Sequence, residues 1–293
     1  MKIFVTGVGG QLGYDVANEL KKRGHIAITS DIKDSISDEF NYVQLDITNK
    51  AKVEEKLKEI QPDAVIHCAA WTNVDGAEDE ENKPLVFKVN IEGTRNLAGA
   101  CKTLNCKMIY ISTDYVFNGE GEDPWGADSE NYQPLNVYGE SKLGGELAVK
   151  EILEKYFIVR IAWVFGENGS NFVKTMLRIG KDRKEIKVVN DQIGTPTYTY
   201  DLARLLVDMI ETEKYGVYHA TNEGGYISWY EFACEIFKLA KYDVNVIPVT
   251  TMEYGLSKAK RPFNSRLDRS KIKECGFEPL PLWTDALKRY IEK

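Results

Sequence analysis

The sequence predicts a doubly wound α/β fold followed by a smaller, partly discontinuous C-terminal lobe. Short runs rich in Ile and Val alternate with segments of helical apolar spacing, as expected for a parallel sheet with crossover helices. The runs lack strict alternation of apolar and polar residues, which is typical of strands covered on both faces. A glycine-rich turn joins the first run to the first helical segment.

The expected elements follow one another in strand–helix order over the first half of the chain. The strands are expected at 2–7, 25–31, 42–46, 63–70, 107–113 and 156–166. Helices are expected at 11–23, 49–60, 81–105 and 138–154, where the apolar spacing is helical.

The regularity falls off after about residue 165. Ser228 and Glu231 have the spacing of a capping box, which marks a helix start in this part of the chain. Other expected elements are a helix at 171–182, an apolar run at 186–191 and a helix after 195–200. We therefore divide the chain into a parallel Rossmann domain at 1–166, with a return excursion at about 186–217, and a smaller lobe at 167–185 and 218–293.

Composition and charge exclude several classes of protein. The 293 residues are 43% hydrophobic and 28% charged, which suits a globular chain, and the net charge of -7 gives no footprint for nucleic acid. The start at Met1 leads directly into an apolar strand, and no apolar stretch is long enough to cross a bilayer. The five cysteines form no Cys-x-x-Cys pair, so neither a disulfide framework nor a zinc site is indicated. We expect a cytoplasmic protein without nucleic-acid or membrane partners.

The turn after the first strand, "GVGGQLG", has the pattern of a dinucleotide-binding loop. Glycines spaced by three let the backbone turn sharply and approach a pyrophosphate, while the N-terminus of the next helix offers free N–H groups to the anion. No Gly-Lys-Ser/Thr follows, so a P-loop is excluded. The residues expected to bind the cofactor here are Gly7, Gly10, Gln11, Leu12 and Gly13.

Two further strand ends fit a bound dinucleotide. Asp31 ends the second strand at the distance expected for a carboxylate that accepts both ribose hydroxyls. Asp46 and Ile47 end the third strand, where an adenine would lie. Asp31 favours NADH over NADPH because a 2'-phosphate would meet a negative charge, but Lys33 nearby offsets that charge. The choice between NADH and NADPH is therefore open.

The fifth strand turns polar at its end, with Thr113 and Asp114 where the cofactor crevice should open. Some 25 residues later, Tyr138 and Lys142 stand four apart on one face of a helix. A lysine ammonium in that place is expected to lower the pKa of the phenol and to hold the nicotinamide ribose. Tyr254 and Lys258 have the same spacing, but no strand ending in Ser or Thr precedes them, and we interpret that pair as structural.

These residues, together with longer motifs, resemble the extended short-chain dehydrogenases/reductases, and among them the dTDP-4-dehydrorhamnose reductase family. The resemblance covers nearly the whole chain, and "STDYVF", "NDQ-G-PT" and "RP-NS-L" are far more specific than the glycine loop. The motifs are "TGVGGQLG" at 6–13, "CAAWTNVDGAE" at 68–78, "KVNIEGTRNLA" at 88–98, "STDYVFNG" at 112–119, "PLNVYGESKLGGE" at 134–146, "RIAWVFG" at 160–166, "NFVKTM" at 171–176, "NDQIGTPTYT" at 190–199 and "RPFNSRLD" at 261–268.

The resemblance implies hydride transfer from NADPH or NADH to the C4 ketone of dTDP-4-dehydro-L-rhamnose. It implies that Tyr138 protonates the developing alkoxide, that Thr113 hydrogen-bonds the same oxygen, and that Lys142 tunes the tyrosine and binds the cofactor. The other implied contacts are to the cofactor from Ala69, Ala70 and Thr72, to the sugar from Asp114 and Trp163, and to the diphosphate from Arg261.

The resemblance also implies a homodimer and, more weakly, Mg²⁺ held at a subunit interface by acidic side chains. Asp15 lies where one such side chain is expected, but no further ligands can be assigned, and the chemistry requires no metal. The pair Gly144 and Gly145 lowers the helix propensity of the segment that carries Tyr138, which indicates close packing against a neighbour.

Two alternative functions remain open at this point. A nucleotide-sugar epimerase and a reductase of another keto-deoxysugar would use the same central residues. The epimerase would differ in keeping its cofactor bound. A noncatalytic regulatory subunit, like the relative that partners methionine adenosyltransferase, would not need them. The presence of Thr113, Tyr138 and Lys142 together favours an enzyme.

Overall fold

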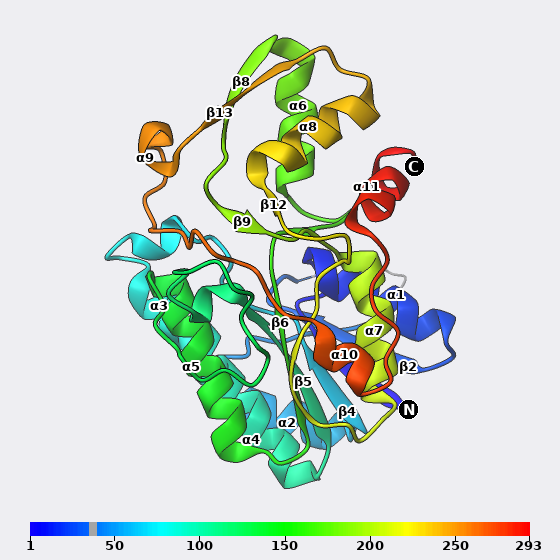
Figure 1. The fold of residues 1–293 in the computed structure, drawn as a ribbon. Helices are drawn as coiled ribbons and strands as arrows, with labels where there is room; N and C mark the ends of the chain where they lie inside the picture. The colour runs from blue at the N-terminus through cyan, green and yellow to red at the C-terminus, as the bar shows by residue number, and fades with distance from the viewer. Residues whose placement is uncertain (35–39) are drawn as a thin grey trace.

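The computed structural model describes residues 1–34 and 40–293, and in this part of the chain a seven-stranded parallel sheet forms the base of the molecule (Figure 1). The strand order β11-β6-β5-β4-β1-β2-β3 reverses direction between β1 and β4, which creates the switch point where α/β folds bind ligands. The strands are β1 Lys2–Thr6, β2 Ile26–Asp31, β3 Asn41–Gln44, β4 Ala64–His67, β5 Lys107–Thr113, β6 Tyr156–Ile161 and β11 Gly216–His219. The predicted parallel fold is confirmed.

Helices cover both faces of the sheet, as the apolar strands predict. On β1, Ile3 and Val5 pack in one core cluster with α1 (Gln11–Lys22) and α7 (Thr199–Ile210). Phe4, between them, packs in a second cluster on the opposite face. That face is covered by α2 Lys50–Ile60, α4 Thr94–Leu104 and α5 Val137–Ile152.

Two expected elements differ in the structure. The helix expected at 81–105 is divided into α3 (Lys83–Phe87), a π-helical turn η2 (Lys88–Gly93) and α4. In this π-helical turn, the Asn90 side chain accepts a hydrogen bond from the Trp71 backbone N–H at 2.8 Å. The strand expected at 156–166 ends at Ile161, and β7 (Val164–Phe165) pairs instead with β10 (Thr197–Tyr198).

A smaller lobe stands above the carboxyl ends of the strands (Figure 1). In it, β8 pairs with β13 and β9 pairs with β12, so the run expected to return to the main sheet at 186–191 pairs within this lobe, and only β11 completes the sheet. The capping box of Ser228 and Glu231 is confirmed at the start of α8. The elements are α6 Phe172–Asp182, β8 Glu185–Val189, β9 Ile193–Gly194, β12 Ile227–Ser228, α8 Trp229–Ala240, β13 Asn245–Val249, α9 Thr251–Tyr254, α10 Ser270–Glu274 and α11 Trp283–Ile291.

The glycine pair in α5 packs closely, as its low helix propensity predicts. A Cβ on Gly145 would lie 2.2 Å from the hydroxyl oxygen of Tyr110 on β5, and one on Gly144 would lie 2.4 Å from Ile91. The glycines therefore let α5 approach the sheet. None of the helices in the described residues is long and apolar enough to cross a membrane.

Candidate active site

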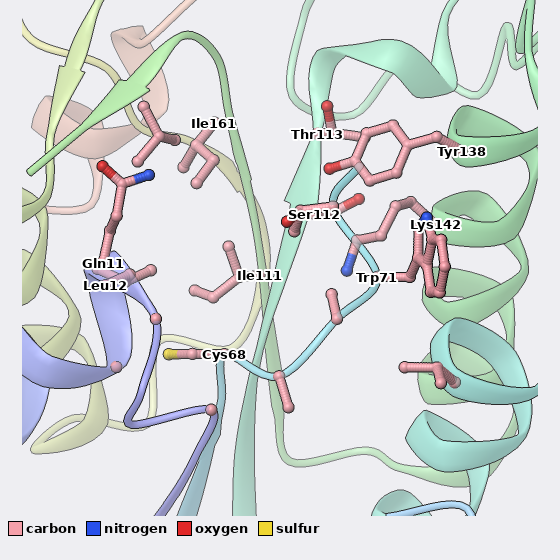
Figure 2. Close-up of a pocket in the computed structure, with 18 of the residues that line it drawn as sticks. Gln11, Leu12, Cys68, Trp71, Ile111, Ser112, Thr113, Tyr138, Lys142 and Ile161 are labelled. Carbon is pink, nitrogen blue, oxygen red and sulfur yellow. The ribbon is translucent and has the colours of Figure 1, made fainter. Parts of the chain in front are cut away.

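A cavity of about 760 Å³ lies at the carboxyl ends of the central strands, below the smaller lobe (Figure 2). Residues from the glycine loop, from β2, β5, β6 and α5, and from the segment after β4 form much of its wall. All residues predicted to bind cofactor or substrate lie on this wall: Gly7, Gly10, Gln11, Leu12, Gly13, Asp31, Asp46, Ile47, Ala69, Ala70, Thr72, Thr113, Asp114, Tyr138, Lys142, Trp163 and Arg261. The structure thus brings together segments from residue 7 to residue 261.

The glycine loop has the geometry that a dinucleotide requires. Gly7 has a φ of +73°, and a Cβ there would lie 2.6 Å from the backbone nitrogen of Ala69. A Cβ on Gly13 would lie 2.2 Å from the carbonyl oxygen of Gly7. Only glycine fits at these positions, and the resulting turn leaves the N-terminus of α1 facing the cavity, where it can bind a pyrophosphate. The loop therefore fits the implied cofactor.

Asp31 borders the same end of the cavity. One carboxylate oxygen accepts a hydrogen bond from the Gly9 backbone N–H at 3.0 Å, and the other accepts one from Ile32 at 2.9 Å. The carboxylate is thereby fixed at the wall, next to the glycine loop. Asp46 accepts a hydrogen bond from the backbone N–H of Thr48 at 2.9 Å, and Ile47 packs below the π-helical turn near Gly93.

Thr113, Tyr138 and Lys142 lie across the cavity from Gln11 and Leu12 (Figure 2). Thr113 ends β5, and its hydroxyl donates to a carboxylate oxygen of Asp114 at 2.9 Å. Tyr138 lies in the first turn of α5. Asn136 caps this helix, since its side chain accepts a hydrogen bond from the Gly139 N–H at 2.8 Å. Strand end and helix start therefore place the two hydroxyls at one point on the wall.

Three buried polar atoms on this wall have no hydrogen-bond partner among the described residues. They are the second carboxylate oxygen of Asp114 and the hydroxyls of Ser112 and Ser30. Buried polar groups are nearly always paired in folded proteins, so unpaired ones beside a cavity indicate where a ligand donates or accepts. Burial raises the pKa of Asp114 to about 6, although the nearby hydroxyls of Ser265 and Thr113 oppose the rise.

The pKa expected for Tyr138 is not found. Burial raises the pKa of this phenol above its usual value, the charge of Asp114 raises it further, and a hydrogen bond with Thr113 only partly opposes these effects. Lys142 was expected to lower the pKa of Tyr138, but it does not do so in the protein without ligands. Burial also lowers the pKa of Lys142, to about 7. Tyr138 is therefore protonated at neutral pH.

Lys142 is only 4% exposed, and its ammonium lies 4.1 Å from the centre of the Tyr110 ring. Its amine points into the cavity (Figure 2). The backbone of the same turn is fixed, because the Tyr110 hydroxyl donates to the carbonyl oxygen of Lys142 at 3.1 Å. A buried ammonium with a cation–π contact is well placed to donate to ligand hydroxyls.

Trp163 holds an unusual backbone conformation at the wall. Its φ of +50° lies in the left-handed region, which costs a bulky residue on the order of 1–3 kcal/mol. The residue separates β6 from β7, and its carbonyl oxygen accepts from the backbone N–H of Thr197 at 3.2 Å. Its indole stacks on Trp229, with ring centres 3.7 Å apart. Strain of this kind persists where the surrounding structure holds a functional side chain in place.

Arg261 reaches the wall but is already paired. Its guanidinium donates to Asp75 at 2.7 Å and to the hydroxyl of Tyr115 at 3.2 Å. A diphosphate would therefore compete with Asp75 for this cation. The second Tyr-x-x-x-Lys pair lies apart from the cavity wall: Tyr254 is on α9, and Lys258 forms an ion pair with Asp79.

Three aromatic residues line the cavity although the sequence did not predict a binding role for them. Trp71 and Tyr115 lie directly beside assigned residues, and the quoted motifs at 68–78 and 112–119 contain both. Trp229 comes from the first position of α8 in the smaller lobe, and no local pattern links it to the strand ends.

The described residues of one chain form no cluster of magnesium ligands. Over residues 1–34 and 40–293, no group of three or more His, Cys, Asp or Glu side chains could hold a metal ion. Asp15 instead accepts a hydrogen bond from the Thr199 hydroxyl, and burial raises its pKa to about 6. No step of the chemistry is therefore assigned to a metal.

The cavity combines a glycine-rich nucleotide-binding loop, a threonine at the end of a strand and a helix with the Tyr-x-x-x-Lys motif. This combination defines an extended short-chain dehydrogenase/reductase. Residues 1–293 match the family model described as the RmlD substrate binding domain. Together with curated relatives of 35–41% identity over almost the full chain, this match shows that the protein belongs to the dTDP-4-dehydrorhamnose reductase family.

Individual relatives are similar over nearly their whole length. The spore coat polysaccharide biosynthesis protein SpsK of Bacillus subtilis is 37% identical over 100% of this chain and 97% of its own. The dTDP-4-dehydrorhamnose reductase of Streptomyces griseus is 41% identical over 97% of this chain and 90% of its own. The structure of the Bacillus anthracis reductase in complex with NADP has a TM-score of 0.91, 43% identity and 100% coverage of both chains.

Proposed function

We propose that this protein reduces the C4 ketone of dTDP-4-dehydro-L-rhamnose to give dTDP-L-rhamnose, with NADPH or NADH as the reductant. The observation that carries the proposal is the meeting of Thr113, Tyr138 and Lys142 on the wall of the cavity that the glycine loop also lines. Membership of the reductase family supports the choice of substrate.

The bound cofactor supplies the hydride, and the residues of the chain supply the proton and the geometry. Tyr138 is the proton donor: its raised pKa keeps it protonated at neutral pH, and an alkoxide is more basic than a phenolate, so the transfer is downhill. Thr113 has one hydroxyl proton, which it donates to Asp114, and it turns this proton toward the substrate oxygen when the ketone binds. Lys142 donates from its ammonium to the ribose of the nicotinamide.

The two lobes divide the binding of the two ligands in this proposal. The Rossmann part holds the dinucleotide through the glycine loop, Asp31 and the residues after β4. The smaller lobe, which we place at 167–185 and 218–293 and which also includes β8 and β9, holds the dTDP-sugar, with Arg261 at the diphosphate. From the Rossmann part, Trp163 and the free carboxylate oxygen of Asp114 contact the sugar. The NADP-bound relative supports NADPH, and the charge of Asp31 supports NADH, so both are assigned as cofactors.

The test is oxidation of the reduced nicotinamide, followed by its absorbance band, with dTDP-4-dehydro-L-rhamnose and each coenzyme in turn. Stoichiometric oxidation with formation of dTDP-L-rhamnose is expected. Cofactor that stays bound through purification without net oxidation would instead indicate an epimerase. Turnover only with another keto-deoxysugar would change the substrate, and a stable complex with a second enzyme but no turnover would indicate a regulatory subunit. The mass in solution tests the homodimer.

A further inference from the structure

The stacked pair of Trp163 and Trp229 joins the two lobes at the cavity wall. The rings are nearly parallel, 16° apart, and Trp229 also packs against Phe172 with ring centres 4.7 Å apart. The smaller lobe is built so that this pair forms: β12 pairs with β9, which places Gly194 against the Trp163 indole and Trp229 directly after the strand. A Cβ on Gly194 would lie 2.9 Å from the Trp163 ring.

Strand register places this pair next to the reacting centre. Thr113 at the end of β5 pairs with Ile161 at the end of β6, and Trp163 follows two residues later. The indoles of Trp163 and Trp229 therefore border the part of the cavity that any ketone bonded to Thr113 and Tyr138 occupies. A nucleobase lies a ribose and two phosphates away from the sugar and cannot reach this position at the same time.

The atoms next to the reacting carbon decide which wall they meet. In the proposed substrate, C4 is flanked by C3, which carries a hydroxyl, and by C5, which carries the C6 methyl group. The wall at Asp114 presents a buried carboxylate oxygen without a partner, which suits the hydroxyl side. The wall at Trp163 and Trp229 presents stacked aromatic carbon, which suits the methyl side.

We infer that Trp229, stacked on Trp163, is a specificity-determining residue that packs against the C6 methyl of a 6-deoxy sugar. The inference rests on the proposed function and deepens it. A hydroxyl in place of a hydrogen on C6 would face indole carbon and lose its hydrogen bonds to water, so the wall selects deoxygenated sugars.

The test compares the binding of dTDP-L-rhamnose and dTDP to the full chain loaded with NADP⁺, by calorimetry. The ratio of the two dissociation constants isolates the contribution of the sugar. Trp229→Ala should weaken binding of dTDP-L-rhamnose about tenfold or more, as expected for lost apolar contact with one methyl group, and leave dTDP unchanged. Trp229→Phe should keep most of the parent ratio.

Two further variants keep the result decisive. Trp229→Gln serves if Trp229→Ala does not fold, because glutamine is a good helix former at the first turn of α8. It should show the same roughly tenfold weakening of dTDP-L-rhamnose binding. Trp283→Phe, in the same aromatic cluster but away from the cavity wall, should lower the melting temperature without changing the ratio. If Trp229→Gln leaves the ratio of dissociation constants unchanged, or weakens the binding of dTDP and dTDP-L-rhamnose equally, the role of Trp229 is overturned. The proposed function would not be affected by that result. Failure of the parent protein to bind dTDP-L-rhamnose would overturn the proposed function as well.

Discussion

Glu146 and Arg160 form a bidentate ion pair that is completely buried, with N···O distances of 2.8 and 2.7 Å. Glu146 lies one turn after Lys142 on α5, and Arg160 lies on β6, so the pair fixes α5 to the sheet. Arg160 also donates to the hydroxyl of Tyr132 at 3.0 Å and to the carbonyl oxygen of Ala127 at 3.2 Å. One guanidinium thus ties β6 to α5 and to the loop that carries Ala127 and Tyr132.

Glu146→Gln should lower the free energy of unfolding by about 3–5 kcal/mol, because it leaves the Arg160 cation buried without its counter-charge. Urea unfolding followed by circular dichroism measures this. The double variant Glu146→Leu with Arg160→Met is the control, since replacing a whole buried pair by apolar side chains is often neutral or stabilising. Equal losses in the single and double variants would show that the hydrogen-bond geometry, and not the unpaired charge, sets the stability.

Tyr138→Phe should reduce kcat by about 10² or more while the dissociation constant of the reduced cofactor stays near that of the parent. The change removes the proposed proton donor beside Thr113 and adds no charge to the cavity. Steady-state rates and fluorescence titration with the cofactor measure the two quantities. The matched control is Tyr254→Phe, which alters a Tyr-x-x-x-Lys pair on α9 and should leave both unchanged. A fully active Tyr138→Phe protein would remove the assignment.

Lys142 should make stability depend on pH in a defined direction. Its pKa is lowered from 10.5 to about 7 by burial, so the unfolded chain binds more protons than the folded one between pH 7 and 10.5. The buried charge of Lys142 therefore lowers the free energy of unfolding most below pH 7, and this destabilisation decreases as the pH rises from 7 to 10.5. Lys142→Met should therefore raise the melting temperature more at pH 6 than at pH 10. The same variant should bind the cofactor weakly at both values.

A melting-temperature gain in Lys142→Met that is equal at pH 6 and pH 10 would contradict the lowered pKa. In the parent protein, cofactor affinity should also fall as the pH rises through about 7, because the ammonium that we propose donates to the ribose loses its proton. The affinity of Lys142→Met should lack this step. Calorimetric titrations over the same pH range measure the difference.

Asp31→Asn should raise the preference for NADPH over NADH by about tenfold, since it removes a negative charge beside the 2'-position and a tenfold change corresponds to about 1.4 kcal/mol. The amide oxygen of asparagine can still accept the hydrogen bond from Gly9, with the NH2 group in place of the oxygen that accepts from Ile32, so the contact to the glycine loop is kept. The ratio of kcat/KM values for the two coenzymes measures the effect. No change in this ratio would show that the carboxylate does not face the 2'-position.

The parts of the site that could be predicted from the sequence are those fixed by local structure. The glycine loop follows β1, and Asp31 and Thr113 are the last residues of β2 and β5. The carboxyl ends of strands in a parallel sheet meet at one edge. Tyr138 and Lys142 share a helix face by spacing alone. These local rules bring the residues to one cavity.

The parts that escaped prediction depend on long-range packing. Trp229 reaches the wall because β12 pairs with β9, a register that no local pattern encodes. The break after Ile161 arises from the left-handed conformation of Trp163, which tertiary contacts impose on a residue that favours strands. The raised pKa of Tyr138 depends on burial, which spacing does not reveal.

Gly145→Ala should lower both stability and turnover, because the added methyl group would lie 2.2 Å from the Tyr110 hydroxyl and 2.7 Å from the carbonyl oxygen of Asn90. Overpacking of this kind costs about 1–3 kcal/mol, and relief requires α5 to move away from β5. That movement would carry Tyr138 and Lys142 with it, so kcat should fall although neither side chain is changed.

The matched control for Gly145→Ala is Gly99→Ala on α4, where an added methyl group meets nothing within 4 Å. Alanine has the higher helix propensity, so this variant should gain about 0.5–1 kcal/mol and keep full activity. Urea unfolding and kcat of the two variants decide the matter. A gain in stability for Gly145→Ala like that of Gly99→Ala would show that a methyl group fits between α5 and β5. The close approach of α5 to β5 would then not be what positions Tyr138, the proposed proton donor, in the cavity.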